Sequence, residues 1–324
     1  MSIDAPVFIG GAGRSGTTLL VDMLGLHSRL SPIYETDYVI GLGQLLFASP
    51  GLSRSEVESR CRSLMADWAK DLPHRPDNKA PHERFHHGPH HVLFNREQAM
   101  EAVEQLLVDV RSTNPHQAFR ACLDKLFGIH TRLDSKPRWI NKTPSYVLST
   151  GFLANVYPEM VFINCVRDGR DVACSMGARV GSRNFDYFAR WWKGRVQAAD
   201  AFQRAYPNKI KTVIYEELLT HPEQVLGEVL EFVGESNQEV ESMLRRYTQN
   251  GVVLDPSRTG RWRERFTEDD ADRFWEIAGV ELERFGYVAK HPGVSVFKTQ
   301  SEISTARTGE ASAPSRASGS ATSV

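Results

Sequence analysis

The residues best suited to chemistry lie near the start of the chain, in the stretch GGAGRSGTT that ends at Thr18. Gly11 and Gly16 have the spacing of a phosphate-binding loop, in which a lysine and then a serine or threonine follow the second glycine. Here Thr17 stands in the place of that lysine, and Arg14 lies inside the loop. Successive backbone N–H groups and the two threonine hydroxyls still predict an anion cradle. The missing lysine argues against a triphosphate, because that lysine contacts the outer phosphates.

A second candidate anion site lies in the stretch VRDGRDVACSM. Arg167 follows the apolar segment Val161–Val166, and Ser175 lies two helical turns further on. Open α/β sheets bind ligands at the carboxyl ends of their strands, which is where Arg167 is expected. A guanidinium gives a phosphate charge and direction, and a hydroxyl adds a short-range donor. A solvated ion pair of Arg167 with Asp168 or Asp171 is the alternative, and this stretch alone does not decide.

The periodicity of apolar residues places both stretches in a chain of alternating strands and helices. Apolar segments at Val7–Gly10, Val161–Val166 and Lys211–Tyr215 predict strands, and Asp168 is expected to cap the helix after the second. Helical spacing predicts helices over Gly16–Leu26, Tyr38–Phe47, Ser55–Lys70, Arg96–Arg111, Pro115–Leu133, Pro222–Val233 and Glu268–Phe285. Such alternation is typical of an α/β fold with a parallel sheet covered on both faces.

The composition is that of an ordinary globular protein. The chain has 324 residues, 41% hydrophobic and 24% charged, which suffices for one large α/β domain. Its net charge of -1 offers no overall field for nucleic acid or an anionic membrane, so any anion site must be local. The four cysteines form no metal-ligand pair, and we expect buried thiols. With no leader-like start and no apolar run near the ~20 residues that span a bilayer, we expect a cytoplasmic protein without a membrane span.

Two other stretches leave their interpretation open. Five histidines between His82 and His91 invite a metal site, but a glycine and a proline interrupt their spacing, so a surface or substrate-entrance loop is favoured. The stretch RWW at residues 190–192 lies in an aromatic stripe with helical spacing, for which core packing is favoured over ligand contact. Residues 291–324, rich in Ser, Thr, Ala and Gly, are expected to form a disordered tail.

Taken together, the two anion stretches resemble those of the PAPS-dependent sulfotransferases, whose donor is 3'-phosphoadenosine 5'-phosphosulfate (PAPS). The 5'-phosphosulfate loop of that family is similar to GRSGTT, and its 3'-phosphate motif is similar to RDGRDVACS. The chain looks most like the protein-tyrosine sulfotransferase branch, through VFIGGAGRSGTTLLVDML, ETDYVI, INKTP, FINCVRDGRDVACSM and VIYEELLTHP. The resemblance implies a P-loop-containing α/β/α fold over residues 1–290, with the loop at its centre. A helical insertion at about residues 36–133 would close over the acceptor side.

The resemblance also implies which residues hold the donor. The 5'-phosphosulfate loop falls on Gly13, Arg14, Ser15, Gly16, Thr17 and Thr18. The 3'-phosphate site falls on Arg167 and Ser175. Further donor contacts fall on Arg179, Tyr215, Ser257 and Arg263. The last two lie in SRTGRWRERF, where an arginine replaces the lysine of the family's Gly-x-Trp-Lys region.

Two further residues match the catalytic residues of the same branch, Glu35 in YETD and Lys142 in NKTP. Sulfuryl transfer needs a base for the acceptor proton, in-line positioning, and positive charge where the leaving phosphate gains its own. Glu35 would be the base, Lys142 the cation, and Arg14 would help to hold the donor. Because a sulfuryl group carries less charge than a phosphoryl group, no metal is required. The alternatives are a solvated carboxylate at the start of a helix near Tyr38 and an exposed loop lysine.

The acceptor and the reaction class each keep alternatives. Asp37 and Thr143 differ from the branch, which has an arginine and an acidic residue at these positions and recognises acidic peptides. The expected acceptor is therefore a hydroxyl of a small molecule, glycan, lipid or protein tyrosine, and the sequence does not choose. A nucleotide-dependent kinase is disfavoured by the missing lysine. A non-catalytic nucleotide-binding protein is disfavoured by the presence of both Glu35 and Lys142.

Overall fold

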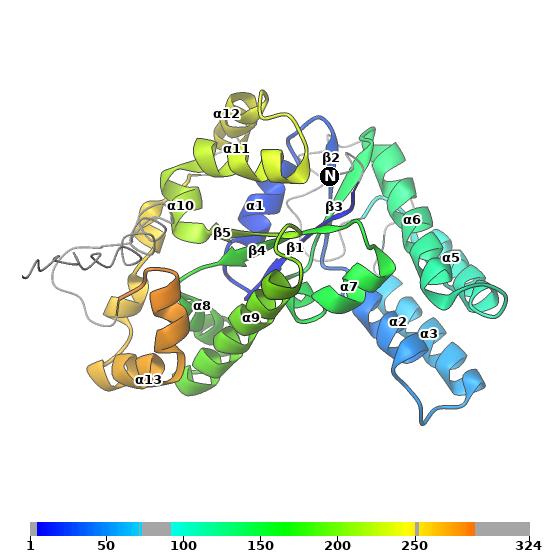
Figure 1. Cartoon of the computed structure of the whole chain (residues 1–324), viewed down its shortest axis with the longest axis horizontal. Helices are drawn as coiled ribbons and strands as arrows, with labels where there is room; N and C mark the ends of the chain where they lie inside the picture. The colour runs from blue at the N-terminus through cyan, green and yellow to red at the C-terminus, as the bar shows by residue number, and fades with distance from the viewer. Residues whose placement is uncertain (1–4, 71, 73–91, 250–252, 289–324) are drawn as a thin grey trace, which may run out of the picture.

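A parallel β-sheet runs through the centre of the molecule (Figure 1). The structure, a computed structural model, describes residues 5–70, 72, 92–249 and 253–288. Within them the sheet has five strands in the order β2-β3-β1-β4-β5, and neighbouring strands are parallel. The strands are β1 (Val7–Gly11), β2 (Leu30–Tyr34), β3 (Arg138–Lys142), β4 (Val161–Val166) and β5 (Ile210–Ile214). The strand that precedes the glycine loop is therefore the central one, as expected.

Burial on both faces explains why the sequence of β1 is apolar throughout rather than alternating. Successive side chains of a strand point to opposite faces. Val7 and Ile9 accordingly pack in one hydrophobic cluster with helix α1 (Thr17–Leu24), and Phe8 packs in another with the helices of the opposite face. Both clusters include residues from elements distant in sequence, which pack against the two faces of the sheet.

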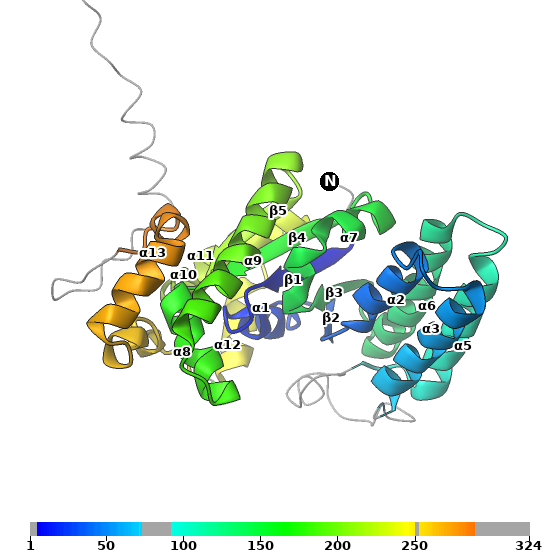
Figure 2. The same ribbon diagram turned by 90° about the horizontal axis from the view of Figure 1, so that it is seen from below.

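Helices cover both faces of the sheet and give three layers (Figures 1 and 2). On the face of α1 lie α10 (Tyr215–Thr220), α11 (Pro222–Val233) and α12 (Val240–Gln249). The other face carries η1 (Pro144–Leu148), α7 (Thr150–Val156), α8 (Gly169–Val180), α9 (Phe185–Ala205) and α13 (Glu268–Arg284). The expected P-loop-type α/β/α fold is confirmed.

Between β2 and β3 the described chain forms a group of helices to one side of the sheet (Figure 2). They are α2 (Tyr38–Phe47), α3 (Arg54–Ala69), α5 (Arg96–Asp109) and α6 (Pro115–Asp134). Ser53 and Asn95 begin α3 and α5 with capping boxes, in which each side chain accepts the third backbone N–H of its helix. These helices lie close to their predicted bounds. The histidine-rich stretch and the tail at 291–324 lie outside the described residues.

The clearest difference from the sequence prediction is β2, whose sequence LSPIY contains a serine and a proline. Proline lacks a backbone N–H and is tolerated in edge strands, and β2 is an edge of this sheet. The four cysteines are free and buried, as expected. No helix in the described part of the chain is long and apolar enough to cross a bilayer.

Candidate active site

Each of the five strands has a predicted functional residue at or just after its carboxyl end. The glycine loop follows β1, Glu35 follows β2, Lys142 ends β3, Arg167 follows β4 and Tyr215 follows β5. Because parallel strands end at the same edge, these groups share one edge of the sheet, which is where open α/β sheets bind ligands.

The glycine loop has backbone angles that require its glycines. Gly11 has φ +140°, and a Cβ atom there would lie 2.3 Å from the Cys165 carbonyl oxygen. Gly16 has φ +84°, and its Cβ would meet the ring of Tyr215 at 2.4 Å. No side chain caps α1 after Gly16, so the first N–H groups of the helix keep their donors for another partner. Buried Ser15 Oγ has no hydrogen-bond partner among the described residues. These donors fit an anion.

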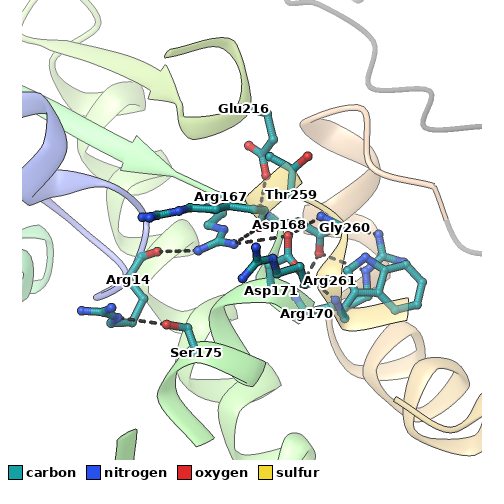
Figure 3. A network of polar contacts seen from close by, with 12 residues as sticks. Arg14, Arg167, Asp168, Arg170, Asp171, Ser175, Glu216, Thr259, Gly260 and Arg261 are labelled. Carbon is teal, nitrogen blue, oxygen red and sulfur yellow. Dashed lines mark hydrogen bonds and ion pairs between the residues drawn. The ribbon is translucent and has the colours of Figure 1, made fainter. Parts of the chain in front are cut away.

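Arg14 and Arg167 join the two anion stretches (Figure 3). Arg14 Nε donates a hydrogen bond to Ser175 Oγ at 3.0 Å, although the residues are 161 positions apart. The Arg167 guanidinium lies over the Tyr215 ring, 4.6 Å from its centroid, and donates to the Arg14 carbonyl oxygen at 3.5 Å. Its Nη2 is also 3.5 Å from the Asp171 carboxylate, so the ion pair that the sequence left open exists as well. It does not exclude a ligand, because Arg167 Nε is buried without a partner among the described residues.

A cavity of about 1030 Å³ opens beside these groups, large enough for a nucleotide. Its lining includes most of the predicted donor residues, namely Arg14, Gly16, Thr17, Thr18, Arg167, Ser175, Arg179 and Tyr215. Gly13 lies instead against Trp191, whose ring would be 3.5 Å from a Cβ atom at that position. Trp192 is a core residue, as favoured from the sequence, and its Nε1 donates to the Arg167 carbonyl oxygen at 3.1 Å.

Besides Gly13, three predicted donor contacts are absent from the lining of this cavity, namely Ser15, Ser257 and Arg263. Ser257 donates its backbone N–H to the Asp255 carboxylate, and Arg263 lies over the Trp262 ring, 4.8 Å from its centroid. The lining contains neighbouring arginines that sequence reasoning missed, Arg258, Arg261 and Arg265, together with Asp22 and Tyr247. The run RTGRWRER carried the signal, but which arginines face inward depends on the short turns η2 (Pro256–Arg258) and η3 (Arg261–Glu264).

Glu35 and Lys142 form an ion pair between neighbouring strands. Lys142 is paired in register with Tyr34, so the residue after β2 lies beside the end of β3. Lys142 Nζ contacts Glu35 Oε1, and the Glu35 N–H donates to the Lys142 carbonyl oxygen at 2.8 Å. The Lys142 side chain is 2% exposed and that of Glu35 is 29% exposed. The lysine is therefore not an exposed loop residue, and Glu35 directly follows β2 in left-handed conformation (φ 51°) rather than starting a helix.

A buried acid supports the end of β4 from behind. Glu216 accepts the Asp168 backbone N–H at 3.1 Å and the Tyr287 hydroxyl at 2.9 Å, and Asp168 caps α8 by accepting the Arg170 N–H, as predicted (Figure 3). Burial raises the pKa of Glu216 from 4.5 to about 7, with a contribution from the Asp168 carboxylate. Glu216 therefore favours its protonated form in the folded protein below about pH 7.

The pH dependence of stability should reflect this acid. A folded pKa above the unfolded one gives a stabilising contribution that is present below about pH 4.5 and lost as the pH rises through about 7. Glu216→Gln stays neutral at every pH. We therefore expect the difference in unfolding free energy between this variant and wild type to grow by about 2–3 kcal/mol in favour of the variant as the pH rises from 5 to 8. Urea denaturation of both proteins across this range measures the gain. Parallel curves would contradict it.

In the described part of the chain, no group of three or more His, Cys, Asp or Glu side chains is arranged to hold a metal ion.

The sequence model of the Sulfotransferase family matches residues 6–239, most of the chain. The chain belongs to the sulfotransferase family. This confirms the resemblance that the glycine loop and the RDGRD stretch predicted.

Two similar proteins match this chain at low sequence identity. It is 25% identical over 237 residues to an uncharacterized protein of Aquifex aeolicus (strain VF5) and 23% identical over 234 residues to protein-tyrosine sulfotransferase A of Caenorhabditis elegans. Each alignment covers 70% of this chain, which spans only 25% and 49% of the lengths of these relatives. The sulfotransferase domain of the Synechococcus PCC 7002 olefin synthase superposes with a TM-score of 0.50 at 18% identity, over 96% of both chains, and shows the shared fold.

Proposed function

We propose that this sulfotransferase-family protein transfers the sulfuryl group of PAPS to the hydroxyl of an acceptor. The observation that carries the proposal is the Arg14–Ser175 hydrogen bond, because it joins the lysine-free glycine loop to the second anion stretch in one cavity. A ligand with two separate phosphates suits this pair of sites. A nucleoside triphosphate with a single phosphate chain suits it less well, and it would lack the lysine that contacts its outer phosphates.

The donor side of the proposal assigns one phosphate to each stretch. The loop residues Gly13 to Thr18, with the N–H groups that open α1, would hold the 5'-phosphosulfate. Arg167 and Ser175 would hold the 3'-phosphate, with Arg179 and Tyr215 beside the nucleoside. The unpartnered donor Arg167 Nε supports the fit, since a buried donor without an acceptor costs free energy until a ligand supplies one, and Arg167 lines the cavity. PAPS supplies an activated sulfuryl group bonded to a phosphate leaving group.

The reacting side of the proposal rests on Glu35 and Lys142. Glu35 would accept the proton of the acceptor hydroxyl as that oxygen attacks sulfur, and the ion pair with Lys142 would orient its carboxylate. As Glu35 takes up the proton, its hold on Lys142 weakens, and the ammonium would stabilise the charge that develops on the leaving phosphate oxygen. Lys142 lies at the end of β3, between Glu35 and the glycine loop of β1, so the order of the strands suits this relay.

The acceptor is proposed to be a hydroxyl compound other than an acidic peptide. Asp37, two residues after Glu35, places a carboxylate at the start of α2, where it accepts a hydrogen bond from Ser145 Oγ at 2.7 Å. The ten residues of α2 itself carry no charged side chain. Negative charge of an acceptor would therefore meet repulsion here. We also propose a cytoplasmic location, which the four free, buried thiols support.

Incubation with radiolabelled PAPS and a panel of phenols, sugars, lipids and tyrosine peptides tests the reaction. We expect label on at least one acceptor class and none on acidic peptides. Calorimetry with adenosine 3',5'-bisphosphate and with ATP plus Mg²⁺ tests the donor separately. Tighter binding of ATP would favour a kinase, and tight bisphosphate binding without transfer to any acceptor would favour a non-catalytic nucleotide-binding protein.

Arg167→Met should weaken binding of adenosine 3',5'-bisphosphate by about 10- to 100-fold, because charge-assisted hydrogen bonds to a phosphate contribute about 1.5–3 kcal/mol. Affinity for adenosine 5'-phosphate, which lacks the second phosphate, should change by less than about threefold. Titration calorimetry measures both. Arg263→Met is the matched control, since the structure leaves that arginine outside the cavity, and it should change neither affinity by more than about twofold. A larger effect at Arg263 than at Arg167 would reverse the assignment.

A further inference from the structure

The segment Asp255–Arg265, which we call the strap, lies along the donor cavity and is held to α8 (Figure 3). It consists of η2 and η3 joined at Gly260. Three of its arginines line the cavity, namely Arg258, Arg261 and Arg265. The strap therefore brings much of the positive charge of the cavity, and whatever fixes the strap fixes that charge.

Asp171 of α8 is where the strap is fastened. Its Oδ2 accepts the Gly260 N–H at 2.6 Å, and its Oδ1 accepts the Trp262 N–H at 2.9 Å. Asp171 as a whole residue is 2% exposed. Gly260 has φ +71°, a conformation that favours glycine and that turns the strap between these two N–H groups. Both oxygens of one buried carboxylate are thus used on the backbone of the strap.

The same carboxylate also reaches the arginine proposed for the 3'-phosphate. Arg167 Nη2 lies 3.5 Å from Asp171 Oδ2 and donates a hydrogen bond to the Arg258 carbonyl oxygen at 2.6 Å. Asp171, Arg167 and the strap therefore each contact the other two. A shift of the strap would release Arg167 from one of its acceptors.

The pKa of Asp171 reflects two opposing influences from its surroundings. Burial and the neighbouring Asp168 carboxylate raise the pKa of Asp171, whereas Arg167 and the two strap N–H groups lower it. Breaking the contacts with the strap would leave a buried carboxylate without its hydrogen bonds, which is costly. On balance the pKa of Asp171 is raised, and the two hydrogen bonds from the strap are what offset the cost of burying this carboxyl group.

We propose that Asp171 is a positioning residue that fastens the strap over the cavity and thereby sets the preference of the site for a nucleotide with a 3'-phosphate. The inference rests on the proposed function and extends it, since Asp171 acts through its contacts with Arg167 and with the backbone of the strap. A carboxylate is required because it accepts at both oxygens, whereas an asparagine accepts at one and presents an NH₂ group to the second N–H.

Asp171→Asn tests the proposal through ligand selectivity and backbone exchange. Affinity for adenosine 3',5'-bisphosphate should fall about tenfold or more, and affinity for adenosine 5'-phosphate less than about threefold, as measured by calorimetry. Hydrogen–deuterium exchange should accelerate in peptides that cover the strap. The matched control is Glu235→Gln, another buried carboxylate in an ion pair, 2.9 Å from Arg138. Arg138 also binds the Ala5 carbonyl oxygen before β1, so the control lies at the opposite edge of the sheet. It should leave the affinity ratio and the exchange of the strap unchanged.

Gly260→Ala provides a second route if Asp171→Asn does not fold. An alanine Cβ at this position would lie 2.1 Å from the Arg263 guanidinium, and alanine would have to adopt the positive φ of Gly260. Both effects should loosen the strap without changing any residue of α8. The same selective loss of bisphosphate affinity is expected. Equal loss of both affinities, or unchanged exchange of the strap in a folded variant, would overturn the role of Asp171. If wild type does not prefer the bisphosphate, the proposed function fails instead, while exchange of the strap still reports whether Asp171 fastens it.

Discussion

Glu35→Gln is expected to lower the rate of sulfuryl transfer by about 10²-fold or more, the usual range for loss of a general base. Glutamine keeps the shape of the side chain and its contact with Lys142 Nζ but cannot take up the acceptor proton at neutral pH. The effect should fall on kcat, because the donor cavity is lined by other residues. Steady-state rates with the best acceptor of the panel measure it, and calorimetry with adenosine 3',5'-bisphosphate should show little change.

Glu239→Gln is the control for Glu35. Glu239 is a carboxylate of similar exposure, 35%, that pairs with Ser28 away from the candidate site. Its replacement should leave kcat within about twofold of wild type. Wild-type turnover in Glu35→Gln would remove the base from the mechanism and leave only the donor site standing.

Lys142→Met is expected to lower kcat by about 10²- to 10³-fold, the loss seen when a group that stabilises developing negative charge is removed. Methionine fills a buried site of similar shape, so packing around β3 should survive. The carboxylate of Glu35 would lose its partner but stays hydrated, because it is 29% exposed. Single-turnover measurements with bound PAPS isolate the chemical step from binding.

Lys136→Met is the control for Lys142, because it removes another largely buried lysine that lies away from the candidate site. Lys136 Nζ donates to the Gly25 and Leu30 carbonyl oxygens near the start of β2, at the other end of the sheet. We expect a lower melting temperature for this variant without a tenfold loss of kcat. If both lysine variants lose activity in proportion to their stability, Lys142 has a structural role only.

The glycine loop and the end of β4 could be predicted because each is determined by residues close in sequence. The loop needs glycine at Gly11 and Gly16, an apolar strand before it and a periodic helix after it, and all of these are local patterns. Asp168 was recognisable as a helix cap for the same reason. The ion pair between Glu35 and Lys142 was not accessible, since it depends on β2, which pairs with a strand more than a hundred residues away.

The strap shows a different limit of the sequence. Four arginines lie close together in RTGRWRER, and which of them line the cavity depends on the short turns η2 and η3, which sequence periodicity does not specify. The resemblance to the family pointed to Arg263, whereas the structure places that side chain on Trp262. The role of Asp171 was likewise hidden, because its partners are backbone N–H groups, which any sequence would supply.

The order β2-β3-β1-β4-β5 places two neighbouring strands, β2 and β3, on either side of a long helical segment of the chain. The described helices α2, α3, α5 and α6 all lie in the chain between Glu35 and Lys142, while the proposed donor contacts lie before and after that interval. If these helices close over the acceptor, as the family resemblance implies, substitutions in this single stretch would remodel the surroundings of the acceptor without altering the residues that line the donor cavity. Under the proposed function, a change of acceptor would then require changes in only one contiguous piece of the gene.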